Sequence, residues 1–120
     1  MSDFILYHNP RWSKSREAVL LLENNNIDFT VIEYLKTHIT KKDVLSLSVK
    51  LGMPVSGFIR KNESDFKENN FNNIIDNNNA LADAVAQYPK IMERPIAVRG
   101  ERAVVGRPPN KILALINWGN

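Results

Sequence analysis

Polar and basic side chains cluster between Tyr7 and Arg16, in the run Tyr-His-Asn-Pro-Arg-Trp-Ser-Lys-Ser-Arg. A short apolar run precedes this stretch and an amphipathic pattern follows it, so it is predicted to join a strand to the start of a helix. Its chemically useful side chains are those of His8, Arg11, Ser13, Lys14, Ser15 and Arg16. Cations, hydroxyls and the backbone N–H groups of a first helical turn together form a place to bind an anion.

Strong nucleophiles are missing from this stretch and from the whole sequence. The chain has no cysteine, which excludes disulfides, thiolate metal sites and thiol catalysis by its own residues. Ser13 and Ser15 carry hydroxyls, but a serine nucleophile needs a general base and nothing marks His8 as one. We therefore predict that Ser13 caps the helix and do not expect serine catalysis. With two histidines and no carboxylates at ligand spacing, no metal site is expected.

A strand, a helix and a second strand are predicted to position this stretch. Residues 4–7 form a short apolar run that ends at Asn9-Pro10, which is typical of a buried strand. A helical pattern begins at Ser13 and ends near the asparagines at 24–26, and residues 29–34 are rich in β-branched and aromatic side chains. Such a unit places its two strands parallel in one sheet.

The middle of the chain, about residues 40–90, is predicted to be a helical insertion. Thr40 has the chemistry of an N-cap, and Gly52 follows the last apolar position of the same helix. Residues 69–79 hold seven asparagines, so this segment is predicted to be a polar loop or a poorly packed helix. Residues 80–87 have helical propensity.

The last third predicts a hairpin followed by a helix. Residues 94–98 and 102–106 are short apolar runs across a glycine-containing turn, and residues 110–116 continue as a helix. The order βαβ, helices, ββα predicts an α/β fold, a three-layer sandwich around a mixed four-stranded sheet, similar to thioredoxin with a helical insertion. We expect a single domain over residues 1–120.

Composition and charge fit an ordinary globular protein with one core. The chain has 120 residues, of which 43% are hydrophobic and 24% charged, and its net charge is +3. Because it has no polybasic tract, nucleic-acid binding is not expected. No apolar run approaches the roughly 18 residues that span a bilayer, and the sequence does not open with an export signal. We therefore expect a cytoplasmic monomer that does not associate with membranes.

Four segments resemble the motifs of one family. Residues 5–16 resemble the opening Tyr-His-Asn-Pro-x-Cys-x-x-Ser-Arg of the glutaredoxin-linked arsenate reductase family. Three later segments resemble its arginine motifs in the same order, namely Phe-Ile-Arg-Lys-Asn at 58–62, Glu-Arg-Pro-Ile-Ala-Val at 93–98 and Gly-Arg-Pro at 106–108. The resemblance covers nearly the whole chain.

The resemblance implies a reaction and a set of site residues. In that family the loop cysteine attacks arsenate as a thiolate, glutathione completes the reduction as a co-substrate, and glutaredoxin recycles the enzyme. The family binds no further cofactor. Carried over by motif, the oxyanion arginines are Arg60, Arg94 and Arg107, the residues around the nucleophile are His8, Ser15 and Arg16, and Pro95 is expected to be cis.

Trp12 stands where the family has its cysteine. An indole cannot act as the nucleophile, so the ring either fills the space of the oxyanion or folds out onto the surface. Without a thiol to tune, His8 is expected to bond within the loop instead of activating a nucleophile. Each of the three arginines, taken alone, could equally be a solvated surface residue, and their convergence on one anion is an inference from the fold.

The sequence thus predicts an arsenate-reductase-like protein that has lost the reductase activity and keeps a pocket for arsenate, phosphate or sulfate. The alternative is a non-catalytic interaction protein, because a sibling of this family with the same fold binds RNA polymerase and regulates transcription. Gly52 and the general fold favour that alternative, but the sibling's Cys-x-x-Cys is absent.

Overall fold

The computed structural model describes residues 3–118, which form two compact units. Unit 1 joins the beginning of the chain, up to Thr37, to its end, from Arg94 onward, and unit 2 is His38–Glu93. Unit 2 covers the stretch where the sequence predicts a helical insertion. None of the described helices is long and apolar enough to cross a membrane.

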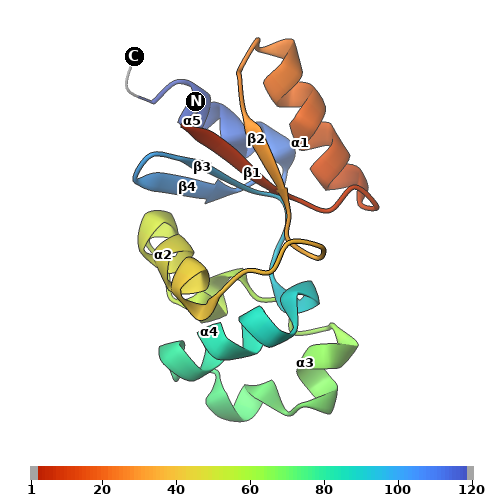
Figure 1. The fold of residues 1–120 in the computed structure, drawn as a ribbon, viewed down its shortest axis with the longest axis vertical. Helices are drawn as coiled ribbons and strands as arrows, with labels where there is room; N and C mark the ends of the chain where they lie inside the picture. Colours follow the sequence, from red (N-terminus) through yellow and green to blue (C-terminus); the bar gives the residue numbers. More distant parts are fainter. Residues whose placement is uncertain (1–2, 119–120) are drawn as a thin grey trace. The chain divides into compact units, whose positions relative to one another are not determined.

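Unit 1 is built on a mixed four-stranded sheet (Figure 1). Its strands are β1 (Phe4–His8), β2 (Thr30–Glu33), β3 (Ile96–Arg99) and β4 (Arg102–Val105), in the spatial order β2-β1-β3-β4. The predicted βαβ unit is present, since β1 and β2 are parallel. The predicted hairpin is also present, with β3 antiparallel to both β1 and β4.

One face of the sheet packs against α1 (Ser13–Asn24) and the C-terminal helical segment. That segment consists of the 3₁₀ helix η4 (Pro109–Ile112) and α5 (Leu113–Ile116). The apolar stripe of α1 is the source of this packing, because Ala18 and Leu22 recur at helical spacing and are completely buried. The shared core consists of Phe4, Leu6, Ala18, Leu22, Ala97, Ile112 and Leu115.

Arg99 fastens the end of the chain to the sheet. Its Nη1 donates to the carbonyl oxygens of Leu115 at 2.9 Å, Ile116 at 3.1 Å and Trp118 at 2.6 Å. Leu115 and Ile116 belong to the last turn of α5, where carbonyls lack the usual partners four residues further on, so a guanidinium is a suitable donor to them.

Unit 2 is helical in all of its elements. It contains α2 (Lys41–Leu51), η1 (Val55–Phe58), α3 (Ser64–Glu68), η2 (Phe71–Ile74), α4 (Asn78–Gln87) and η3 (Pro89–Ile91). The ends of α2 are the predicted ones. Thr40 forms a capping box with Asp43, and Gly52 ends the helix in the left-handed conformation at φ 69°.

The asparagine-rich segment is more ordered than the prediction of a polar loop or poor helix. Asn77 caps α4 by accepting from the N–H of Ala80 at 3.0 Å, so the helix begins at Asn78 and not at residue 80. Asn78 Oδ1 accepts from the N–H of Val55 at 2.8 Å, which ties α4 to η1. Asparagine oxygens thus replace backbone acceptors at two points of unit 2.

Candidate functional site

Strand register brings three motifs to one edge of the sheet in unit 1. Ile96, at the start of β3, pairs with Tyr7 near the end of β1 and with Val105 at the end of β4. The loop that follows β1, the segment that precedes β3 and the segment that follows β4 therefore leave the sheet at the same edge. These segments carry Trp12, Arg94 and Arg107, respectively.

The loop after β1 is closed by its own hydrogen bonds. Asn9 is central, because its backbone N–H donates to Ser15 Oγ at 3.3 Å and its Oδ1 accepts from the N–H of Arg11 at 3.1 Å. Its carbonyl accepts from the N–H of Trp12 at 3.1 Å. Both Asn9 and Ser15 are buried. From the sequence, Asn9 is expected only to mark a turn, although an Asn-Pro pair also indicates a side chain that bonds its own backbone.

The first turn of α1 has no side-chain cap. The prediction that Ser13 caps the helix is wrong: Ser13 is the first helical residue, and Trp12 occupies the N-cap position, where its indole offers no oxygen to accept from the turn. The first turn also holds no acidic residue. Its positive end is therefore not compensated by a carboxylate of that turn. Arg16 is exposed and donates from Nη1 to the carbonyl of Pro10 at 3.0 Å.

The indole of Trp12 lies over the guanidinium of Arg94. Arg94 Cζ is 3.8 Å from the centroid of the ring, within the range of a cation–π contact. Arg94 is only 2% exposed, whereas Trp12 is 45% exposed. The ring was expected either to fill the pocket or to lie on the surface. It does neither completely, because one of its faces contacts the guanidinium while the side chain remains half-exposed.

The Arg94 and Arg107 segments are joined by a hydrogen bond. The N–H of Gly106 donates to the carbonyl of Pro95 at 2.8 Å. The Arg94–Pro95 peptide bond is cis, as expected, and so is Arg107–Pro108, which the motifs do not predict. Arg107 is partly buried. Arg94 and Arg107, the two motif arginines in unit 1, thus lie in neighbouring segments at the same edge of the sheet.

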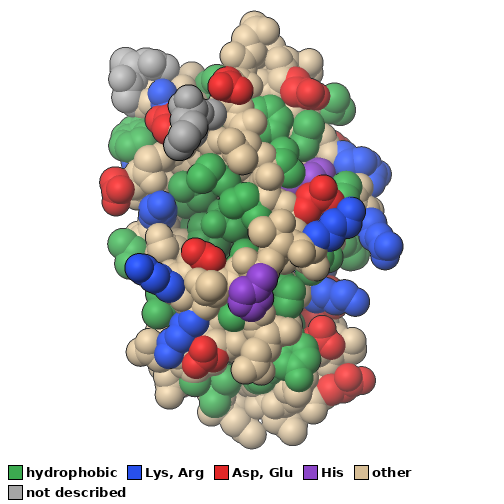
Figure 2. All heavy atoms as spheres, viewed as in Figure 1, with side chains coloured by type: hydrophobic (Ala, Val, Ile, Leu, Met, Phe, Trp, Pro, Cys, Tyr) green, Lys and Arg blue, Asp and Glu red, His purple; other side chains and the backbone are tan. Residues whose placement is uncertain are grey.

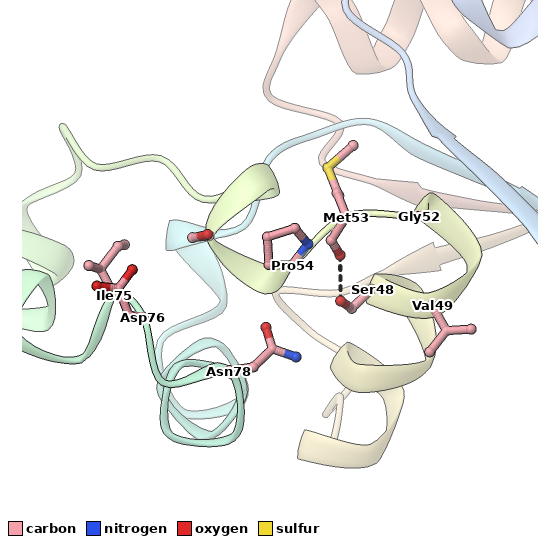
Figure 3. Close-up of a pocket in the computed structure, with 9 residues that line it drawn as sticks. Ser48, Val49, Gly52, Met53, Pro54, Ile75, Asp76 and Asn78 are labelled. Carbon is pink, nitrogen blue, oxygen red and sulfur yellow. Dashed lines mark hydrogen bonds between the residues drawn. The ribbon is translucent and has the colours of Figure 1, made fainter.

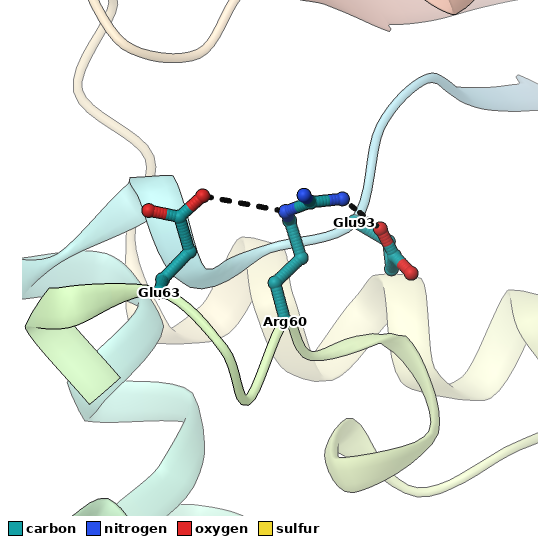
Figure 4. A network of polar contacts seen from close by, with 3 residues as sticks. All are labelled: Arg60, Glu63 and Glu93. Carbon is teal, nitrogen blue, oxygen red and sulfur yellow. Dashed lines mark hydrogen bonds and ion pairs between the residues drawn. The ribbon is translucent and has the colours of Figure 1, made fainter. Parts of the chain in front are cut away.

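Arg60 belongs to unit 2, where it forms ion pairs with Glu63 and Glu93 (Figure 4). The convergence of Arg60 with Arg94 and Arg107 on one anion stays a prediction.

His8 ends β1 beside a cavity of about 310 Å³. Its imidazole is 8% exposed, and Nδ1 is buried with no hydrogen-bond partner among the described residues. The expected bond between His8 and the loop is therefore not made by Nδ1. Burial lowers the pKa of His8 below 6.5; Glu33 opposes this shift and Arg16 adds to it. The cavity is lined by His8, Asn9, Pro10, Arg11, Glu33, Leu35 and Lys36.

Unit 2 has a hollow of its own, of about 490 Å³ (Figure 3). It lies between the end of α2 and the start of α4, and the Ser48 hydroxyl at its wall donates to the carbonyl of Met53. The hollow is wide open and holds no cluster of charged groups. Its lining residues are Ser48, Val49, Gly52, Met53, Pro54, Ser56, Ile75, Asp76 and Asn78.

The charged groups give no sign of a second specialised centre. Across residues 3–118, no three His, Asp or Glu side chains come together as they do around a metal ion. On the face drawn in Figure 2, Lys and Arg side chains are interspersed with Asp and Glu. The concentration of arginine motifs at one edge of the sheet in unit 1 therefore marks the candidate site.

Residues 7–115 match the model of the ArsC family. The chain belongs to the ArsC family. It is 34% identical over 113 residues to an arsenate reductase of Haemophilus influenzae, covering 93% of this chain and 97% of that protein. It is 37% identical over 117 residues to an arsenate reductase of Neisseria meningitidis serogroup B, covering 97% of this chain and 100% of the relative.

Solved structures of the ArsC family share its fold. An arsenate reductase from Vibrio cholerae superposes with a TM-score of 0.88 at 40% identity, covering 92% of this chain and 95% of that one. A related protein from Bacteroides fragilis, at 21% identity, superposes with a TM-score of 0.82 over 94% of this chain and 97% of its own, which shows the fold alone. The predicted thioredoxin-like α/β fold with a mixed four-stranded sheet is confirmed.

Proposed function

We propose that this chain is an ArsC-family protein that binds a small tetrahedral oxyanion without reducing it. The observation that carries the proposal is the buried guanidinium of Arg94. Arg94 precedes β3 at the same edge of the sheet at which α1 begins, and the first turn of α1 has no side-chain cap. A guanidinium and free helical N–H groups are both donors suited to arsenate, phosphate or sulfate. Arg107 is the second motif arginine at this edge.

Loss of the reductase activity follows from the chemistry of the family. Reduction of arsenate there begins with a thiolate, and this chain has no cysteine at any position. An indole at position 12 can neither attack arsenic nor form a disulfide with glutathione. Glutathione and glutaredoxin are therefore partners only of a variant or relative that carries the thiol. We also propose that the protein acts in the cytoplasm as a monomer.

The ring of Trp12 sets a condition on binding. Hydrogen bonds to a guanidinium lie in its plane, so a ring stacked on one face leaves the edge available in principle. Arg94 is nevertheless 2% exposed, so an anion reaches that edge only when the groups that cover Arg94, the half-exposed indole among them, move aside. Binding is therefore expected to be weaker than it would be in a chain without the ring.

Titration of the purified protein with phosphate, arsenate and sulfate, followed by calorimetry, tests the proposal. We expect saturable binding by the wild type that is lost in Arg94→Gln, which keeps a polar side chain but no charge. Lys50→Gln is the matched control, because Lys50 lies on α2 in unit 2 and outside every site motif. Equal binding by wild type and Arg94→Gln would contradict the proposal.

A protein-interaction role is the second candidate. The observation in its favour is the 45% exposed indole of Trp12, since a half-exposed tryptophan is a frequent anchor of protein interfaces. Capture from a cell extract, with the wild type and Trp12→Ala as paired baits, tests this role. RNA polymerase retained by the wild type and lost by the variant would support it, and its absence from both would leave this role without support.

A further inference from the structure

Gly106 is packed between two apolar side chains at the edge of the sheet that carries the candidate site. It is buried, and a Cβ built on it would lie 2.9 Å from Cδ1 of Ile112 and 3.1 Å from Cγ of Pro95. Both side chains therefore press on the side of Gly106 where a side chain would project. The N–H of Gly106 also donates to the carbonyl of Pro95 at 2.8 Å. Contacts this close leave little room for one group to shift alone.

Gly106 and Pro95 are the direct neighbours of the two motif arginines in unit 1. Gly106 precedes Arg107, and Pro95 follows Arg94. A planar peptide bond joins each pair, so a displacement of either neighbour moves the backbone of its arginine. The side chain of Ile112 therefore supports the Arg107 segment directly and the Arg94 segment through Gly106.

Ile112 itself is firmly held. Its side chain is completely buried, and it belongs to the core that the sheet shares with α1. It ends η4, where the N–H of Lys111 donates to the carbonyl of Pro108 at 3.1 Å, so the chain turns back soon after Arg107. Further along, Arg99 binds three carbonyls at and just beyond the end of α5. The helical segment that carries Ile112 is thus anchored at both ends.

We infer that Ile112 is a positioning residue of the proposed oxyanion site. It fixes the spacing of the segments that carry Arg94 and Arg107, and with it the directions in which the two guanidinium groups present their donors. Hydrogen bonds from a planar guanidinium depend strongly on direction, so a small change of spacing weakens binding of an anion by both groups. The inference rests on the proposed function only where it concerns phosphate affinity.

Ile112→Val is the variant that tests this role. It removes Cδ1, the atom closest to a Cβ on Gly106, and keeps a β-branched apolar side chain in the core. Leu115→Val is the matched control, because it removes one methylene group from the same core and the same helical segment. The carbonyl of Leu115 is bonded to Arg99, which ends β3, whereas Pro95 directly precedes the start of β3. The two substitutions therefore act at opposite ends of that strand.

Each variant is measured in two ways, by the NMR resonances of the Nε–Hε groups of Arg94 and Arg107 without anion, and by calorimetry with phosphate. We expect Ile112→Val to shift both resonances and to weaken phosphate binding roughly fivefold. Leu115→Val should lower the midpoint of thermal unfolding, as any core truncation does, but leave resonances and affinity close to those of the wild type. If either resonance moves no further in Ile112→Val than in Leu115→Val, the inference is overturned.

A compensating pair of substitutions adds a test that general destabilisation does not pass. Gly106→Ala places a methyl group against Cδ1 of Ile112, so we expect it to shift the resonances of both arginines. Combined with Ile112→Val, which vacates that space, Gly106→Ala should shift them less than it does alone. Shifts that simply add in the double variant would count against the inference.

The two measurements separate this inference from the proposed function. If the wild type binds no phosphate, the proposed function is overturned, and the resonances of Arg94 and Arg107 still decide whether Ile112 positions their segments. If the wild type binds phosphate and Ile112→Val binds it equally well, the proposed function stands and the inference is overturned.

Discussion

The indole ring of Trp12 covers the guanidinium of Arg94, with Cζ 3.8 Å from the ring centroid and the arginine 2% exposed. Burial removes the water that stabilises a cation, and this costs free energy. The attraction of the electron-rich ring face for the guanidinium offsets part of that cost. The residue that stands at the family's cysteine position is therefore in direct contact with one of the motif arginines. It acts as a cover of the cation that the proposed oxyanion needs.

Removal of this cover is expected to strengthen anion binding. In Trp12→Ala the guanidinium of Arg94 becomes accessible, so phosphate affinity measured by calorimetry should rise. The free energy of unfolding should fall by about 0.5–2 kcal/mol, the range of a cation–π contact. Trp12→Phe is the matched control, since it keeps an aromatic face and should keep weak binding. Equal phosphate affinities in the two variants would show that the ring does not limit access.

Restoring the thiol is expected to restore turnover. In Trp12→Cys the new side chain takes the N-cap position of α1, and the positive end of a helix lowers the pKa of a cysteine there. A coupled assay with arsenate, glutathione and glutaredoxin should show turnover for this variant. The wild type and Trp12→Ser should remain at the uncatalysed rate, because neither supplies a thiolate. Turnover by the wild type would refute the proposed loss of activity.

The sequence predicts the sheet and the main helices because their patterns are local. The apolar run of β1, the stripe on α1 and the caps of α2 all arise within a few residues, and each element is present. Helix α3 was not predicted, since its five residues contain one apolar side chain, Phe66, and show no period. Short helices of this kind depend on tertiary packing.

The sequence names candidate site residues but does not give their contacts. Motif matching brings Trp12 and Arg94 to attention, yet their stacking joins residues far apart in the chain and depends on side-chain conformations that sequence does not determine. The partners of Arg60 show the same limit. Glu63 lies three residues along the chain, whereas Glu93 is far away in sequence and is brought close where Ile59 and Met92 form an antiparallel bridge.

Gly106 should not accept a methyl group without cost. A Cβ there would lie 2.9 Å from Cδ1 of Ile112 and 3.1 Å from Cγ of Pro95. Gly106→Ala is therefore expected to lower the free energy of unfolding by about 1–3 kcal/mol, as measured by urea denaturation. Ile112→Val removes the closest atom, so in that background the same substitution should cost less. Equal costs in both backgrounds would show that this contact is not the source of the strain.

His8 is expected to make stability depend on pH. Its pKa in the folded chain is lowered from 6.5, chiefly by burial, so the unfolded chain takes up the proton more readily. The stabilising effect of a neutral His8 is therefore complete above pH 6.5 and is lost as the pH falls from there toward the lowered folded pKa. Urea denaturation between about pH 5 and about pH 8 covers this window.

The matched pair for this measurement is His8→Gln and His38→Gln, which remove the only two histidines of the chain one at a time. His8→Gln should flatten the fall in unfolding free energy below pH 6.5, because the group whose pKa is shifted is gone. His38→Gln should retain the fall, because His8 is still present. If His8→Gln and the wild type lose the same free energy over this window, the acid sensitivity arises from the carboxylates and not from the buried imidazole at the end of β1.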